Sequence, residues 1–148
     1  MIKNNTKIKN ISINPLVSII ILNYNAGKLL IDCINSILKT NYDNYEIIVV
    51  DNASKDGSHL KCIEKFPKIS LIENNKNLGY CGGNNIGIRK AKGEYITILN
   101  PDTLVDPNWI KELVFAYQKY GEGLYQPKFL TTTDHSSIMS TGNMINLF

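Results

Sequence analysis

Three short apolar runs, each ending abruptly in polar residues, constrain the fold of this chain most strongly. Runs of this length that are rich in β-branched residues are typical of strands buried on both faces of a parallel sheet. An open α/β sheet binds its ligands at the carboxyl ends of such strands. The polar ends therefore predict one shared site, formed by Asn23-Tyr24-Asn25 after the run 19–22, Asp51-Asn52 after 47–50, and Asn100-Pro101-Asp102-Thr103 after 95–99.

Between the runs, apolar residues recur at helical spacing. Leu29, Leu30, Cys33, Ile34, Ile37 and Leu38 recur at steps of one, three and four, which predicts that they mark one face of a helix. Strands begin roughly every 25 residues with a helix between most of them, and this is the pattern of βαβ units in an α/β fold with a parallel sheet. The expected strands are 17–22, 45–50, 69–72, 95–99 and 124–126, and the expected helices are 29–38, 60–66, 86–91 and 109–117.

The sequence indicates one domain. Residues 1–14 show no sustained period and predict a flexible lead-in, and Pro15 opens a domain that covers 15–148. The chain reaches Phe148 without an evident finishing element, so we expect it to be the front part of a longer domain. Apolar surface at such an edge would favour self-association.

Charge and cysteine usage limit the class of partner and the compartment. Lys3, Lys7 and Lys9 carry the formal excess of +3, and the rest of the chain has 13 basic and 13 acidic residues. This balance argues against nucleic acid or an anionic membrane surface as partner. The three cysteines lack CxxC spacing, which favours free thiols in a reducing compartment, the cytoplasm. No run approaches the ~18 to 20 apolar residues of a membrane helix, so we expect no integral membrane segment.

Two carboxylates are the sharpest candidates for chemistry. Asp51 follows a buried strand and could accept hydrogen bonds from a ribose or a base edge, or it could cap the next helix. Asp102 could ligate a divalent cation, which needs only one or two protein carboxylates when diphosphate oxygens complete the shell, or it could belong to an ordinary Asn-Pro-Asp turn.

Other positions give weaker signals. The glycines of 79–87 predict a loop that lets the backbone approach a ligand closely, although the segment is neither a P-loop nor a GxGxxG fingerprint. Tyr24 could stack on a base or pack as an ordinary aromatic residue. Trp109 is expected to anchor a helix, and Cys81 to play no part in the chemistry. His59 and His135 have no partner at metal-ligand spacing and are expected on the surface.

Four motifs in this order make the chain resemble a known family. They are VSIIILNYN at 17–25, YEIIVVDNASKDGS at 45–58, NLGYCGGNNIG at 77–87 and GEYITILNPD at 93–102. The set is similar to the N-terminal half of the GT-A fold of glycosyltransferase family 2, a group of inverting transferases that includes rhamnosyltransferase-like enzymes. The resemblance covers about Pro15 to Leu113.

The resemblance implies a Rossmann-like nucleotide-sugar site on a mainly parallel sheet with helices on both faces. Asp51 and Tyr24 would contact the nucleoside of a UDP-, dTDP- or GDP-linked sugar. Asp102, in the place of the family's Asp-x-Asp motif, would hold Mn²⁺ or Mg²⁺ against the diphosphate. Asn100 replaces the first aspartate of that motif, which should weaken metal binding without nucleotide. The other residues implied to line the nucleotide and sugar are Asn23, Asn52, Gly79, Gly82, Gly83, Asn84 and Asn100.

The leading hypothesis is therefore a hexosyltransferase that transfers sugar to a glycan or lipid-linked acceptor, in the synthesis of a bacterial surface polysaccharide. It would work in the cytoplasm, at the inner face of the cell membrane through peripheral association of the full-length protein. The family's catalytic base comes from the second half of the domain, so we expect it beyond Phe148. Two alternatives stay open: a nucleotide-binding fragment without transferase activity, and a flavodoxin-like binding or regulatory domain.

Overall fold

A computed structural model describes residues 14–131 and 138–140, so nearly all of the expected lead-in 1–14 lies outside the described residues, as does His135. Ten elements follow one another along the described chain. They are β1 (Val17–Asn23), α1 (Lys28–Ile37), β2 (Tyr45–Asp51), α2 (Ser58–Lys65), β3 (Ser70–Glu73), α3 (Gly79–Lys90), β4 (Tyr95–Leu99), α4 (Trp109–Tyr120), β5 (Phe129–Leu130) and β6 (Ile138–Ser140).

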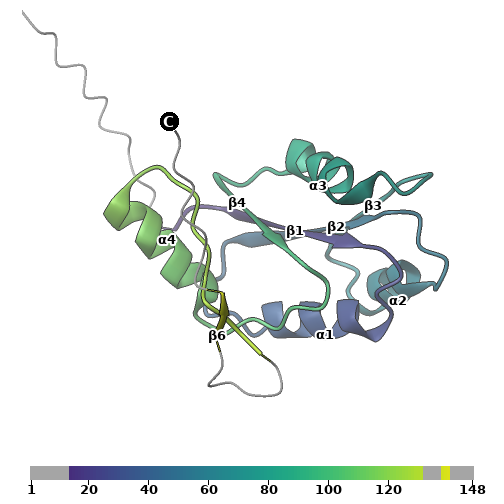
Figure 1. Cartoon of the computed structure of the whole chain (residues 1–148), viewed down its shortest axis with the longest axis horizontal. Helices are drawn as coiled ribbons and strands as arrows, with labels where there is room; N and C mark the ends of the chain where they lie inside the picture. The colour runs from purple at the N-terminus through teal and green to yellow at the C-terminus, as the bar shows by residue number, and fades with distance from the viewer. Residues whose placement is uncertain (1–13, 132–137, 141–148) are drawn as a thin grey trace, which may run out of the picture.

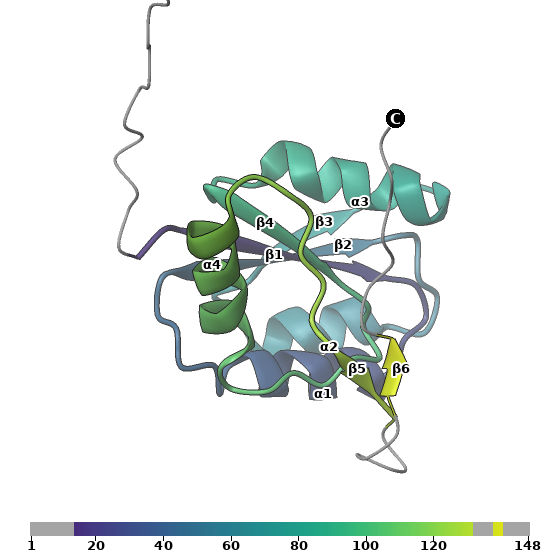
Figure 2. The ribbon, with the colours of Figure 1, turned by 60° about the vertical axis from the view of Figure 1, so that its left-hand side comes forward.

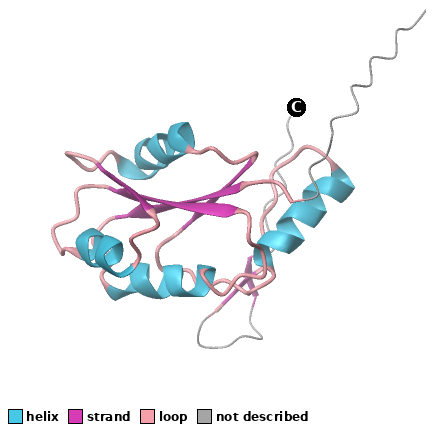
Figure 3. Cartoon of the chain, turned by 180° about the vertical axis from the view of Figure 1, so that it is seen from behind, coloured by secondary structure: helices cyan, strands magenta, loops and turns pink. Residues whose placement is uncertain are grey.

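Strands β1 to β4 form one parallel sheet in the order β3-β2-β1-β4. The prediction of an α/β fold with a parallel sheet is confirmed, and each of the first four expected strands lies within one residue of its observed bounds. Helices cover both faces: α3 lies on one, and α1 and α2 lie on the other (Figure 1 and, from behind, Figure 3). No helix among the described residues is long and apolar enough to cross a membrane.

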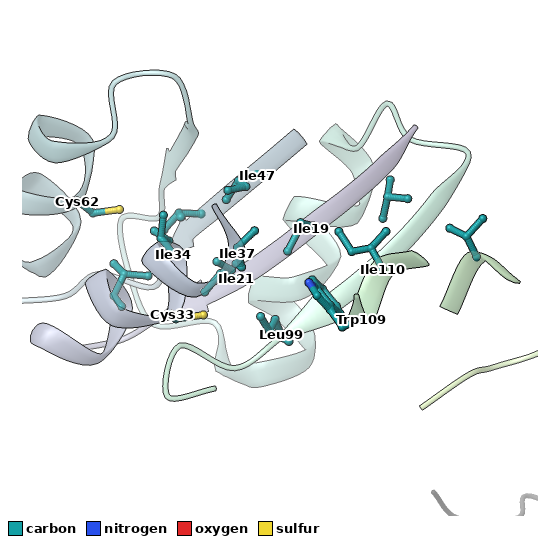
Figure 4. Packing of buried hydrophobic residues seen from close by; sticks show 14 residues of the cluster. Ile19, Ile21, Cys33, Ile34, Ile37, Ile47, Cys62, Leu99, Trp109 and Ile110 are labelled. Atoms are coloured by element: carbon teal, nitrogen blue, oxygen red, sulfur yellow. The ribbon is translucent and has the colours of Figure 1, made fainter. Parts of the chain in front are cut away.

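The larger core lies between the sheet and helices α1, α2 and α4 (Figure 4). Ile19 and Ile21 of β1 point into it, because alternate residues of a strand share a face. Each is fully buried, and burial of a side chain of this size contributes about 1.5 to 3 kcal/mol. Trp109 anchors α4 as expected: it is buried, and its indole Nε1–H donates to Thr40 Oγ1 at 3.0 Å.

The opposite face carries a smaller cluster built on Ile20, Ile48 and Val50, against which α3 packs closely. Glycine makes this approach possible. A Cβ at Gly87 would lie 2.6 Å from Ile20 Cγ2 and 3.1 Å from Val50 Cγ2, and a Cβ at Gly83 would collide with Leu22. Gly83 and Gly87 are four residues apart and so stack on the sheet-facing side of the helix.

The expected glycine loop at 79–87 is therefore wrong, because α3 begins at Gly79. Gly79 has a positive φ of 72°, whereas Gly82, Gly83 and Gly87 do not. The glycines serve contact with the sheet, where a residue without a Cβ is needed.

The expected fifth strand at 124–126 is also wrong. Leu124 is 94% exposed, and the hydroxyl of Tyr125 donates to the Gly121 carbonyl at 2.7 Å, which folds the segment back toward the end of α4. The next strands are instead β5 and β6, which pair antiparallel in a sheet of their own (Figure 2).

The close packing of α3 predicts that Gly87→Ala destabilises the fold. Overpacking against Ile20 and Val50 should cost about 1 to 3 kcal/mol, more than the helix-propensity gain of up to about 1 kcal/mol. Urea unfolding measures the free energy. Gly83→Ala is the matched control, because Leu22 is only half-buried and its side chain can move aside, so its cost should be smaller. Equal or greater stability of Gly87→Ala would contradict this account of the packing.

Candidate functional site

The carboxyl ends of the strands form one edge of the sheet, and three polar side chains lie in a row along it. The ladder pairs Asn23 with Asp51 and Asp51 with Glu73. By alternation these residues share the face of Ile21 and Val49, which is covered by α1 and α2. The structure thus places two of the predicted site residues side by side and adds Glu73, which the sequence analysis did not select.

Asp51 is buried, with 2% of its surface exposed, and both carboxylate oxygens accept a hydrogen bond. Asn23 Nδ2 donates to Oδ1 at 2.7 Å, and the Ser54 N–H donates to Oδ2 at 2.9 Å. The capping alternative is wrong, because α2 begins at Ser58 without a side-chain cap. Asp51 instead holds the loop 52–57 against the end of β1.

A second set of hydrogen bonds joins this loop to the turn after β1. Asp56 Oδ2 accepts from the Gly27 N–H at 2.9 Å, and Asn25 Oδ1 accepts from the Lys55 N–H at 2.7 Å. Desolvation, the largest effect on Asp56, raises its pKa, but hydrogen bonds from Ser58 and Gly27 outweigh it and lower the pKa overall. Asn25 and Ala53 have φ values of 53° and 65°, which non-glycine residues adopt only when the surroundings hold them. The two loops are therefore locked to each other.

Asn52 is a structural hub rather than an exposed side chain. It is 1% exposed; its Nδ2 donates to Asn77 Oδ1 at 2.8 Å and to the Gly79 carbonyl at 3.3 Å. Its Oδ1 accepts from the Leu78 N–H at 3.0 Å and from Asn74 Nδ2 at 3.2 Å. Since the whole amide is engaged, Asn52 fixes the start of α3 beside the end of β2.

Asp102 lies in an exposed turn at the end of β4. Pro101 follows Asn100, whose carbonyl accepts from the Thr103 N–H at 3.2 Å, so proline occupies the position of a β-turn that it favours. The turn is docked on α1, where the Cys33 thiol lies 3.7 Å from the Asn100 carbonyl.

Because β4 pairs with β1 up to Ile21 and Leu99, the turn lies beside the tip of β1, where Tyr24 is 52% exposed.

The predicted metal ligand is a single carboxylate. Within 14–131, no three His, Cys, Asp or Glu side chains group in a way that could hold a metal ion. A hard divalent cation takes carboxylate, amide and phosphate oxygens, and Asp102 and Asn100 present the first two at an exposed turn. The residues therefore fit Mn²⁺ or Mg²⁺ when a bound ligand supplies further oxygens.

The predicted residues of α3 lie in two settings. Gly79 is exposed at the first position of the helix. Gly82 is half-buried, Gly83 faces the sheet, and Asn84 is 3% exposed with its Nδ2 donating to the Tyr80 carbonyl at 3.0 Å. Asn84 Oδ1 has no hydrogen-bond partner among the described residues. The helix body thus buries Gly83 and Asn84, which the sequence had placed in a loop.

The start of a helix follows each of β1, β2 and β3 at this edge. None of α1, α2 and α3 has an acidic residue in its first turn. The Asp56 carboxylate nevertheless accepts from the Gly27 N–H at the start of α1 and from the Ser58 N–H of α2, which offsets the partial positive charge of these two ends. At the start of α3 the Gly79 N–H bonds the neutral Asn77 Oδ1, so this end favours an anion at the same edge.

The expected surface position of His59 is wrong. His59 is 9% exposed and lies between Asp51 and Glu73. Its spacing of three from the buried Cys62 puts both on the inner face of α2, and this was the signal in the sequence that could have found it.

Comparison with known proteins agrees with the resemblance seen in the sequence. The family model described as "Glycosyl transferase family 2" matches residues 18–144. An uncharacterized glycosyltransferase of Haemophilus influenzae is 39% identical over 108 residues, which are 71% of this chain and 33% of that protein. The putative colanic acid biosynthesis glycosyl transferase WcaA of Escherichia coli is 38% identical over 125 residues, which are 82% of this chain and 43% of that protein.

A solved structure shares the fold. The mannosyltransferase PcManGT from Pyrobaculum calidifontis, in complex with GDP-Man and Mn²⁺, superposes with a TM-score of 0.63 and 26% identity over 70% of this chain and 32% of that one. The chain spans about a third to two fifths of the length of these proteins.

The position of Asn52 predicts that Asn52→Ala destabilises the chain by about 2 to 4 kcal/mol, because the four part-buried hydrogen bonds of its amide are lost. Chemical denaturation measures the loss. Asn75→Ala is the control: Asn75 is exposed in the same segment, and its replacement should change the free energy of unfolding by less than about 0.5 kcal/mol. Similar values for the two variants would show that Asn52 does not hold the segment 74–79.

The thiols should differ sharply in reactivity. Burial raises the pKa of Cys33 to about 12 and the pKa of Cys62 to about 11, whereas Cys81 is exposed. Since the thiolate is the nucleophile, a thiol reagent at pH 8 should modify one cysteine quickly and the other two only on unfolding. Cys81→Ser should abolish the fast phase. A second fast phase in the native chain would contradict the burial of Cys33 and Cys62.

Proposed function

The chain belongs to glycosyl transferase family 2, and from this membership we propose that its protein transfers a sugar from a nucleoside-diphosphate sugar to a glycan or lipid-linked acceptor. The observation that carries the proposal is the convergence of Asn23, Asp51 and the Asp102 turn at one edge of the sheet. Membership in the family overturns the flavodoxin-like alternative.

Asp51 is the proposed acceptor for the nucleoside. Each carboxylate oxygen has two lone pairs and uses one for the bond from Asn23 or Ser54. Oδ1 also faces His59 Nδ1, so Oδ2 keeps the acceptor position for a base N–H or a ribose O–H. Because Asp51 is 2% exposed, the loop 52–57 has to shift for the nucleoside to reach it. Tyr24, which is exposed at the neighbouring tip, offers a ring on which the base can stack.

Asp102 and Asn100 are the proposed ligands of Mn²⁺ or Mg²⁺ at the diphosphate. PcManGT, which shares the fold, was solved with GDP-Man and Mn²⁺, and this supports a divalent cation here. When bound, the cation offsets the charge that develops on the departing nucleoside diphosphate. The start of α3, which has no acidic residue in its first turn, adds a favourable field for the same phosphates.

The acceptor is proposed to be a precursor of a cell-envelope polysaccharide. The support is the relative WcaA, which is described as acting in colanic acid biosynthesis. We place the reaction in the cytoplasm, at the inner face of the membrane, since buried protonated thiols such as Cys33 and Cys62 suit a reducing compartment.

The alternative that the chain binds nucleotide without transferring sugar keeps its support, because the chain spans about a third of the length of its relatives. Turnover of a nucleotide sugar by the 148-residue chain would separate the two functions.

The proposal predicts that the chain is stabilised by one nucleoside diphosphate in a metal-dependent way. Thermal unfolding with UDP, dTDP, GDP or ADP, each with and without Mn²⁺, should show one base preferred. At ~100 times the Kd the gain is about 2.7 kcal/mol. Asp51→Asn should weaken binding with and without Mn²⁺, whereas Asp102→Asn should remove mainly the effect of Mn²⁺.

Asp43→Asn is the control for both variants, because this exposed carboxylate precedes β2 at the opposite edge of the sheet. It should bind as the wild type does. A folded chain that responds to none of the four nucleotides would overturn the proposed donor site.

A further inference from the structure

Two carboxylates of like charge are register partners at the edge of the sheet. Asp51 and Glu73 are paired in the ladder between β2 and β3, and like charges on directly opposite residues destabilise a sheet. Water screens only one of them, since the side chain of Glu73 is 60% exposed whereas that of Asp51 is 2% exposed. A compensating positive charge stabilises a buried carboxylate beside a second one, in addition to the hydrogen bonds that it accepts.

His59 lies between these carboxylates on the first turn of α2. Its Nδ1 is 3.6 Å from Asp51 Oδ1, and its Nε2 is 3.4 Å from Glu73 Oε1. Both distances lie within the range of an ion pair and beyond that of a strong hydrogen bond. Nδ1 is buried and has no hydrogen-bond partner in the described part of the chain, so its interaction with Asp51 depends on charge.

The arrangement discriminates between the forms of the imidazole ring. A neutral ring has one N–H and one lone pair, so either tautomer would direct its lone pair at a carboxylate. The imidazolium has an N–H for each of them. Asp56 bonds the preceding Ser58, and Cys62 of α2 and Cys33 of α1 are buried thiols, so none of these three titratable groups offers the carboxylates a positive charge.

We propose that His59 is a positioning residue: its imidazolium bridges Asp51 and Glu73 and holds the Asp51 carboxylate in the orientation that accepts the nucleoside. The part that concerns the nucleoside rests on the proposed function; the bridge itself does not. Since the bridge needs the proton, nucleotide affinity should fall as pH rises through the titration of His59. Glu73, at the solvent end of the bridge, tunes that titration without touching the nucleotide.

The bridge can be tested without any nucleotide. The chain has two histidines, so NMR titration of their ring signals gives two curves, and the curve absent from His59→Gln belongs to His59. In Glu73→Gln the midpoint of the His59 curve should move to lower pH, because one of the two carboxylates that stabilise the imidazolium is gone. Glu64→Gln, on an exposed position of α2, should leave it in place. An unchanged midpoint in Glu73→Gln would overturn the bridge.

The consequence for binding is read from the nucleoside diphosphate that stabilises the wild type most, with its affinity measured at one pH well below and one pH well above the midpoint of the His59 curve found by NMR. The ligand's own phosphate also titrates, so each variant is compared with the wild type at the same pH. Below the midpoint, His59→Gln should bind about tenfold more weakly, the loss expected for a hydrogen bond to a charged group. Above the midpoint the difference should nearly vanish. A constant ratio at both pH values would indicate a merely structural role and overturn the inference.

The outcomes separate the two proposals. If no nucleoside diphosphate binds the wild type but the His59 midpoint shifts in Glu73→Gln, the proposed donor site is overturned while the bridge is supported. If nucleotide binds normally and the midpoint does not shift, the donor site stands and the bridge is overturned. If His59→Gln fails to fold, Glu73→Gln alone tests the bridge, because most of the Glu73 side chain is in water and its replacement should leave the fold intact. Near the midpoint of the histidine titration, Glu73→Gln should then bind the nucleotide more weakly than Glu64→Gln does.

Discussion

The parallel pairing of β1 with β2 on one side and β4 on the other is the constraint on which the rest of the structure depends. It buries β1 on both faces, so the strand needs apolar residues at almost every position, and helices must cover both sides of the sheet. The same register carries the chain out of each strand at one edge. Polar residues that lie far apart in the sequence therefore meet at that edge, because the backbone geometry of the sheet brings them there.

The polar residues at this edge divide into a buried framework and exposed tips. Asn23, Asp51 and Asn52 are almost wholly buried and bond to one another's loops, whereas Tyr24 and Asp102 face water. Buried polar groups that are satisfied by neighbours fix geometry, and exposed ones remain free to meet a ligand. The site is thus open at its rim, whereas Asp51 at its base is covered by the loop 52–57.

Local pattern was enough to predict the four strands of the parallel sheet and the anchoring role of Trp109, because apolar runs and helical spacing report burial directly. It failed where tertiary contact decides. Glycines favour loops, yet Gly83 and Gly87 lie within a helix, because a side chain at either position would collide with the sheet. A lone histidine gives no spacing signal for a partner, and only the register of β2 with β3 shows that His59 lies between two acids. The hydrogen bonds of the Asn52 side chain likewise depend on a segment more than twenty residues away along the chain.

The strand order has a consequence for how the chain acquires its structure. Val17 in the central strand pairs with Tyr45 on one side and with Tyr95 on the other, so the sheet contains no hairpin between neighbouring strands in which pairing could begin locally. Such distant pairing pays the entropy of loop closure before it gains any contact, and it slows folding. During synthesis β1, the most apolar of the three paired strands, is also made before both of its partners. The strand order that brings the polar tips together thus leaves the central strand exposed to other chains until its partners form. Early coverage of β1 by α1 and β2 therefore protects the protein from aggregation.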